Sequence, residues 1–139
     1  MKLFLDANVL FTAAHNPSGK AAFIIELGSH GHWQLVTSAY AVEEAAHNIR
    51  LKFPAQLGAL EQVTARMTVI PSGPGKLCPV PLPDKDKPIL EGAMRSNATH
   101  LLTGDIKDFG PYMNQPEVTA GIIIQTVAEF LANLDPGAR

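Results

Sequence analysis

The chain has 139 residues, of which 46% are apolar and 17% charged, and its net charge is −2 with a pI near 6.2. This length predicts one domain, residues 1–139, and the composition excludes a disordered chain and a protein held on nucleic acid by bulk positive charge. No run of apolar residues approaches the ~20 needed to span a bilayer, and Met1–Leu5 leads straight into Asp6, so neither a membrane anchor nor a leader is expected. The single Cys78 excludes an internal disulfide and favours a reducing, cytoplasmic location.

Short apolar runs alternate with helical patterns in the first half of the chain. Ser18 and Ser38 each precede an apolar helical pattern and are candidate N-caps. The expected order is a strand Lys2–Leu5, a helix Asn8–Ala14, a helix from Ser18 to about His30, a strand Trp33–Thr37, a helix Ala39–Lys52, a helix Ala55–Thr64 and a strand Met67–Ile70.

A proline-rich segment, Pro71–Pro83, follows and predicts an extended surface loop rather than a linker between domains. Beyond it, Thr126 and Glu129 have the spacing of a capping box. The expected order is a helix Asp86–Ser96, a strand His100–Thr103, a loop Gly104–Asn114, a strand Ala120–Ile124, a helix from Thr126 to about Leu134 and a frayed tail from Asp135.

This alternation predicts an α/β fold. Its strands are short and continuously apolar, as strands are when both faces of a sheet are buried. We therefore expect five parallel strands with helices on both faces, a three-layer α/β/α sandwich.

The acidic residues gather where strands end. Five of the six aspartates fall in three short stretches, and Asp6 and Asp105 follow the first and fourth strands. Ligands of open parallel sheets bind beyond the carboxyl ends of the strands, where the strand order reverses. If strands one and four are neighbours, Asp6 and Asp105 meet at that edge.

Two further acids can reach the same edge. Asp86 begins the helix that leads into the fourth strand, and Glu44 lies near the start of the helix after the second strand. Four converging carboxylates repel each other unless a cation lies among them. Oxygen-only ligands suit Mg²⁺ or Mn²⁺, and one or two such ions support phosphodiester cleavage by water.

Four segments in this order resemble the PIN domain, a family of metal-dependent ribonucleases. Each is short and unspecific alone, but together they cover nearly the whole chain. They are Leu3-Phe4-Leu5-Asp6-Ala7-Asn8, Thr37 to Glu44, Asp86 to Ala93, and His100-Leu101-Leu102-Thr103-Gly104-Asp105. Ala7 departs from the pattern, since many members have Thr there.

The resemblance implies a five-stranded PIN-like fold and a Mg²⁺- or Mn²⁺-dependent endoribonuclease. It maps the catalytic and metal-binding quartet onto Asp6, Glu44, Asp86 and Asp105, with Asp108 as a fifth metal ligand and Asn8 and Thr103 as supporting polar residues. Many bacterial members of this size are toxins that a partner antitoxin inhibits, and a homodimer is expected from the family. The RNA-binding residues stay unassigned.

Several alternatives remain open from the sequence. Glu43 could replace Glu44, and Asp84 could replace Asp86, although the spacing favours Glu44 and Asp86. Lysines adjoin the acids, including Lys85, and the expectation for each is an ordinary surface side chain. A catalytically weak RNA- or protein-binding PIN-like module is the main alternative function, and a phosphoacceptor receiver-like domain is a third.

Overall fold

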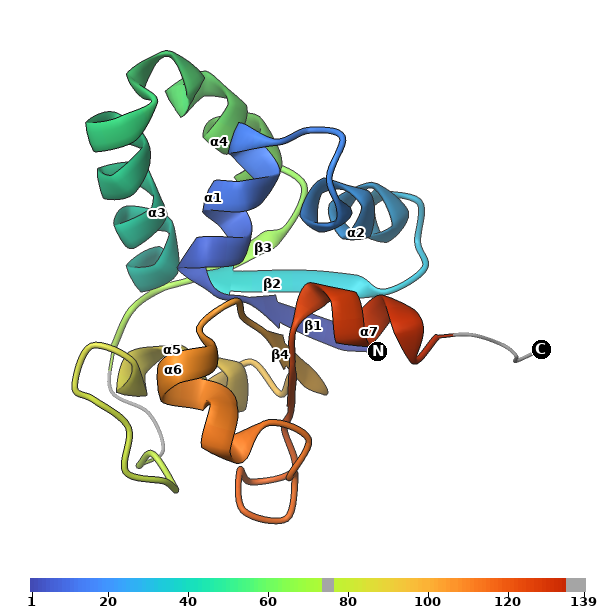
Figure 1. Ribbon diagram of the computed structural model, residues 1–139, viewed down its shortest axis with the longest axis vertical. Coiled ribbons are helices and arrows are strands. Elements are labelled where there is room, and N and C mark those ends of the chain that lie inside the picture. The colour runs from blue at the N-terminus through green and yellow to red at the C-terminus, as the bar shows by residue number, and fades with distance from the viewer. Residues whose placement is uncertain (74–76, 135–139) are drawn as a thin grey trace.

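A five-stranded parallel sheet forms the centre of the computed structural model, which describes residues 1–73 and 77–134 (Figure 1). Its strands lie in the order β3-β2-β1-β4-β5, and each pairs in parallel with its neighbour. The expected α/β sandwich is therefore confirmed. The strands are β1 (Lys2–Leu5), β2 (Gln34–Ser38), β3 (Thr68–Ile70), β4 (His100–Leu102) and β5 (Ile123–Gln125).

Helices cover both faces of this sheet. Figure 1 shows α1, α2 and α4 on one side of the sheet and α5 and α6 on the other, with α3 beside α1. Within the described residues, no helix combines the length and the apolarity that crossing a membrane requires. The helices are α1 (Ala7–His15), α2 (Lys20–Ser29), α3 (Ala39–Lys52), α4 (Leu57–Thr64), α5 (Lys87–Arg95), α6 (Ile106–Phe109) and α7 (Val127–Ala132), with 3₁₀ turns at Pro54–Gln56 and Gly110–Tyr112.

The local signals for these elements are visible in their caps. The Ser38 hydroxyl accepts a hydrogen bond from the Ala41 amide at 3.1 Å and begins α3, as expected. Thr126 and Glu129 form the expected reciprocal capping box at the start of α7. A side chain at Gly92 would place its Cβ 3.0 Å from Phe4 Cζ, so glycine lets α5 pack closely on β1.

Some element boundaries differ from those expected. The N-cap of α2 is Gly19 rather than Ser18, because the Ser18 hydroxyl bonds Asn16 and not the helix amides. The fifth strand begins at Ile123, not Ala120, because Ala120 and Gly121 have φ of 56° and 86° and form a turn. The helix expected over 55–64 divides into a 3₁₀ turn and α4. The expected tail from Asp135 lies outside the described residues, as do residues 74–76 of the proline-rich loop.

The strand order determines where a site can form. The chain builds outward from β1 through β2 to β3, then returns to the other side of β1 with β4. Strands β1 and β4 are therefore direct neighbours, as the sequence argument required, and the order reverses between them. The carboxyl ends of β1 and β4 carry Asp6 and Thr103 to the point where parallel sheets bind ligands.

Candidate metal site at the carboxyl edge of the sheet

Asp6 lies at the end of β1 with only 5% of its surface exposed. Its Oδ1 accepts a hydrogen bond from the Ala7 amide at 2.6 Å, so it also caps α1. Its Oδ2 accepts from the Thr103 hydroxyl at 2.7 Å and from Asn8 Nδ2 at 3.3 Å. Asp6 therefore caps α1 with one carboxylate oxygen and accepts hydrogen bonds from Thr103 and Asn8 with the other.

Asn8 and Thr103 tie the ends of β1 and β4 together. Asn8 Oδ1 accepts from the Gly104 amide at 2.7 Å, and its Nδ2 lies 3.3 Å from Thr103 Oγ1. Thr103 Oγ1 also accepts from the Asp105 amide at 3.0 Å. The two residues named as polar support thus orient Asp6 and the backbone that carries Asp105.

Three other carboxylates converge beside this network. Asp86, Asp105 and Asp108 each offer an oxygen, and these atoms all lie within 4.8 Å of one another. Asp105 Oδ1 accepts from the Asp108 amide at 3.0 Å, so Asp105 caps α6. Asp86 is 7% exposed and precedes α5, but its side chain makes no capping bond. The Asp86 carboxylate is therefore available to the cluster.

Burial and the neighbouring charges both alter the pKa values of the acids at this site. Burial raises the pKa of Asp6 to about 6; hydrogen bonds from Thr103 and Ala7 oppose this, and the charges of Glu44 and Asp86 add to it. Burial likewise raises the pKa of Asp86 to about 6, and the adjacent Asp108 carboxyl adds to the rise. The hydrogen bond with Asp86 lowers the pKa of Asp108. The charge of Glu44 on α3 is thus near enough to raise the pKa of Asp6.

Glu43 and Asp84, the alternatives to Glu44 and Asp86, form ion pairs with other residues. Glu43 Oε1 forms an ion pair with Arg50 at 3.2 Å. Asp84 is 98% exposed at its side chain and pairs with Lys87 at 3.2 Å. Neither belongs to the group formed by Asp86, Asp105 and Asp108, and within the described residues Asp6 and Glu44 lie outside that group as well.

Tyr40 and Lys85 also lie at this edge, although the sequence indicates no role for Tyr40 and predicts an ordinary surface lysine at position 85. The Tyr40 hydroxyl donates to the Lys85 carbonyl at 2.7 Å, and burial, followed by the charges of Glu44 and Asp86, raises the pKa of this phenol. Lys85 Nζ lies 3.3 Å from both Asp86 Oδ2 and Asp108 Oδ2. The sequence did contain one indication that Tyr40 lies near the site. Residues four apart share a helix face, and Glu44 follows Tyr40 by four residues.

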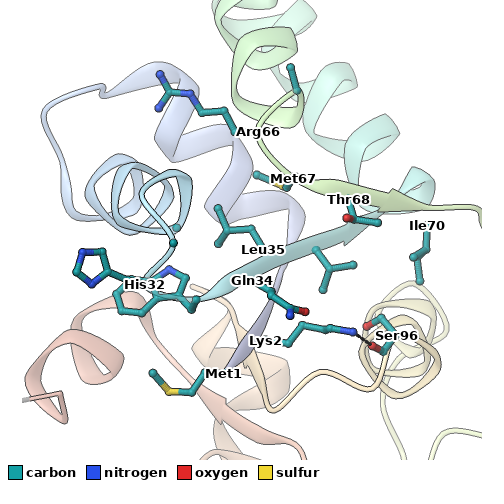
Figure 2. Close-up of a pocket in the computed structure, with 15 residues that line it drawn as sticks. Met1, Lys2, His32, Gln34, Leu35, Arg66, Met67, Thr68, Ile70 and Ser96 are labelled. Carbon is teal, nitrogen blue, oxygen red and sulfur yellow. Dashed lines mark hydrogen bonds between the residues drawn. The ribbon is translucent and has the colours of Figure 1, made fainter.

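A groove of about 930 Å³ lies at the opposite edge of the sheet. Figure 2 shows Lys2 and Gln34, from the amino ends of β1 and β2, among its lining residues, with Lys2 donating to the Ser96 carbonyl at 2.9 Å. Its lining includes no acidic side chain, so the groove is separate from the carboxylates.

The donor set suits a hard divalent cation. Every candidate ligand of the cluster is a carboxylate oxygen, the preference of Mg²⁺ and Mn²⁺, and none is a thiolate or an imidazole. A cationic group, the Lys85 ammonium, already bridges two of the acids. Burial is the main cause of the raised pKa values of Asp6 and Asp86, and the neighbouring carboxylates add to both.

The sequence matches a family model described as the PIN domain over residues 2–107. This range includes Asp6, Glu44, Asp86 and Asp105, whereas Asp108 lies just beyond it. The match overturns the receiver-like alternative. Among curated proteins, no sequence matches this chain significantly.

Solved structures with the same fold come from several bacteria. VapBC2 from Rickettsia felis, bound to a DNA fragment from its promoter, matches with a TM-score of 0.66 and 17% identity over 91% of this chain and 98% of that chain. DNA-bound VapBC from Salmonella typhimurium matches with a TM-score of 0.65 and 15% identity, over 91% of this chain and 98% of that chain. VapC20 from Mycobacterium tuberculosis is described as a toxin that cleaves the sarcin–ricin loop. It matches with a TM-score of 0.58 and 7% identity, over 79% of this chain and 95% of that chain. At these identities the likeness shows the fold.

Proposed function

This chain belongs to the PIN domain family, and from that membership and its carboxylate cluster we propose that it is a metal-dependent endoribonuclease. The observation that carries the proposal is the convergence of Asp86, Asp105 and Asp108 within 4.8 Å, beside Asp6 at the reversal of strand order. The similar fold of a toxin described as cleaving the sarcin–ricin loop supports RNA as the substrate class.

In this proposal Asp6, Glu44, Asp86 and Asp105 are the catalytic quartet, and Asp108 is a further metal ligand. Mg²⁺ or Mn²⁺ held there supplies charge neutralisation and activates water for phosphodiester hydrolysis. Thr103 and Asn8 keep Asp6 in one orientation through their bonds to its Oδ2. Because both pKa values lie near 6, Asp6 and Asp86 are about half ionised at pH ~6 and gain most of their negative charge as the pH rises toward neutrality.

We also propose that the chain is the toxin of a toxin–antitoxin pair. The matched chains from Rickettsia felis and Salmonella typhimurium are in VapBC assemblies, which supports a protein partner that inhibits this one. A homodimer follows from the same family pattern, and light scattering of the purified chain tests it.

The test is RNA cleavage by the purified chain with Mn²⁺ or Mg²⁺ and with EDTA. We expect cleavage of mixed-sequence RNA that EDTA abolishes, and a loss of at least about 100-fold in Asp105→Asn, as removal of a metal ligand predicts. Asn is a good N-cap, so this variant keeps the start of α6. Glu117→Gln, at an exposed loop acid, is the matched control and should cleave like the wild type.

Two outcomes would contradict the proposal. Undiminished cleavage by Asp105→Asn would place the activity elsewhere or in a contaminant. Metal binding or RNA binding without any cleavage would favour the catalytically weak binding module instead.

A further inference from the structure

Lys85 stands at the rim of the carboxylate cluster with its ammonium turned toward the acids. Its Nζ lies 3.3 Å from Asp86 Oδ2, 3.4 Å from Asp86 Oδ1 and 3.3 Å from Asp108 Oδ2. Its side chain is 68% exposed, whereas the Asp86 residue that it contacts is 7% exposed. One flexible cation from the surface thus bridges two of the three grouped acids and offsets part of their charge.

The backbone of this lysine is held in place. The Tyr40 hydroxyl donates to the Lys85 carbonyl at 2.7 Å, which ties the segment before α5 to the first turn of α3. The next residue, Asp86, is buried, and its amide donates to the Pro83 carbonyl at 2.9 Å. The ammonium is therefore tethered beside the cluster and can move away only by rotation of its own side chain.

The same oxygen atoms cannot serve both cations well. Asp86 and Asp108 are two of the three residues whose oxygens lie close enough together to bind one ion. An ammonium that stays on these oxygens would repel a divalent cation bound to them. Metal binding therefore requires the Lys85 ammonium to move away from these oxygens. Because the Lys85 side chain is largely exposed, it can rotate into solvent.

We propose that Lys85 is an internal competitor for the metal ion: its ammonium pairs with Asp86 and Asp108 and so weakens metal binding. This inference rests on the proposed function, because the competing ion is the one that function requires. Lys85 acts through the metal ligands and is a positioning residue rather than a catalytic one.

The test is calorimetric titration of Mn²⁺ into metal-stripped wild type, Lys85→Met, Lys85→Arg and Lys107→Met. Lys85→Met removes the charge and keeps an unbranched side chain, and we expect Mn²⁺ to bind about three- to tenfold more tightly, as loss of two ion pairs predicts. Lys85→Arg keeps the charge and should bind Mn²⁺ no more tightly than the wild type, because a guanidinium pairs with carboxylates at least as well as an ammonium does. Lys107→Met is the matched control, because Lys107 influences Asp108 only through space and should change the affinity by less than about twofold.

Thermal unfolding provides a second readout. Without metal, Lys85→Met should have a lower melting temperature than the wild type, because two acids lose their counter-charge. When Mn²⁺ is added, its melting temperature should rise by more than that of the wild type. A purely structural lysine would lower both melting temperatures equally.

The results separate this inference from the proposed function. If the wild type binds Mn²⁺ and Lys85→Met binds it equally or more weakly, the competitor role is wrong and the metal site stands. If neither protein binds Mn²⁺, both proposals fail. Binding by Lys85→Met alone would support the competitor role in its strongest form.

Discussion

The Thr103 hydroxyl donates a hydrogen bond to Asp6 Oδ2 at 2.7 Å, although the two residues are 97 positions apart in the chain. The same hydroxyl accepts from the Asp105 amide at 3.0 Å. One buried oxygen therefore couples the acid after β1 to the acid after β4.

Replacing Thr103 with Val should weaken the site. The variant leaves Asp6 Oδ2 with one donor fewer and the Asp105 amide unpaired, which costs about 1–3 kcal/mol of stability and about 10- to 100-fold in RNA cleavage. Because the Thr103 bond lowers the pKa of Asp6, its loss should also move the acid limb of the pH–rate profile upward. Thr103→Ser keeps the hydroxyl and should retain most activity; equal losses in Ser and Val would contradict the hydroxyl's role.

Asp6 should make the metal-free protein less stable as the pH rises. Its pKa is 3.8 when unperturbed and about 6 in the fold, so between these values the folded state holds a proton that the unfolded state has released. The stabilisation is complete below pH ~4 and lost above pH ~6, a change of up to about 3 kcal/mol for two pKa units.

Urea unfolding of metal-free wild type and Asp6→Asn between pH 4 and 7.5 checks this. Relative to Asp6→Asn, the wild type should lose stability as the pH rises, and Mn²⁺ should restore it near neutrality. Asp84→Asn, at an exposed acid, should follow the wild type. Parallel curves for wild type and Asp6→Asn would show that Asp6 keeps an ordinary pKa.

Glu44→Gln and Glu43→Gln should separate two adjacent acids on α3. Glu44 adds to the raised pKa of Asp6, whereas the Glu43 carboxylate pairs with Arg50 at 3.2 Å. Initial rates of RNA cleavage with Mn²⁺ should fall at least about tenfold for Glu44→Gln and stay within about twofold for Glu43→Gln. The reverse order would assign the role to Glu43.

Asp86→Asn and Asp84→Asn test the second ambiguity by metal binding rather than activity. Asp86 contributes an oxygen to the group within 4.8 Å, and Asp84 pairs with Lys87 at the surface. Calorimetry should show Mn²⁺ affinity reduced by about 10- to 100-fold in Asp86→Asn and unchanged in Asp84→Asn. Equal affinities in both variants would remove Asp86 from the ligand set.

Gly28→Ala and Gly58→Ala should have opposite effects on stability. A Cβ at Gly28 would lie 2.6 Å from Leu35 Cδ1 and 2.7 Å from its Cγ, so either the buried Leu35 side chain or α2 must shift, at a cost of about 1–3 kcal/mol. At Gly58 in α4 nothing lies within 4 Å, and alanine should add about 0.5–1 kcal/mol through helix propensity. Urea unfolding measures both, and stabilisation by Gly28→Ala would mean that the contact relaxes without cost.

Much of the fold was predictable because its signals are local. Continuous apolar runs such as Leu3-Phe4-Leu5 form strands that are buried on both faces, and Ser38 and Thr126 begin helices through bonds within one turn. Asp6 and Asp105 were visible too, as acids that follow the first and fourth strands, and the carboxyl ends of parallel strands share one edge. The proximity of Asp6 to Asp105 still required β1 and β4 to be neighbours, which only the sheet order decided.

The remaining features depend on contacts between distant segments. Adjacent residues of a helix point about 100° apart. The packing of α3 therefore decides that Glu44 raises the pKa of Asp6, whereas Glu43 pairs with Arg50. Nothing near Lys85 in the sequence indicates that its ammonium bonds Asp108, 23 residues later. Spacing along the chain determines which atoms each element can present, but through-space charge and hydrogen bonding act only after the sheet and helices have packed.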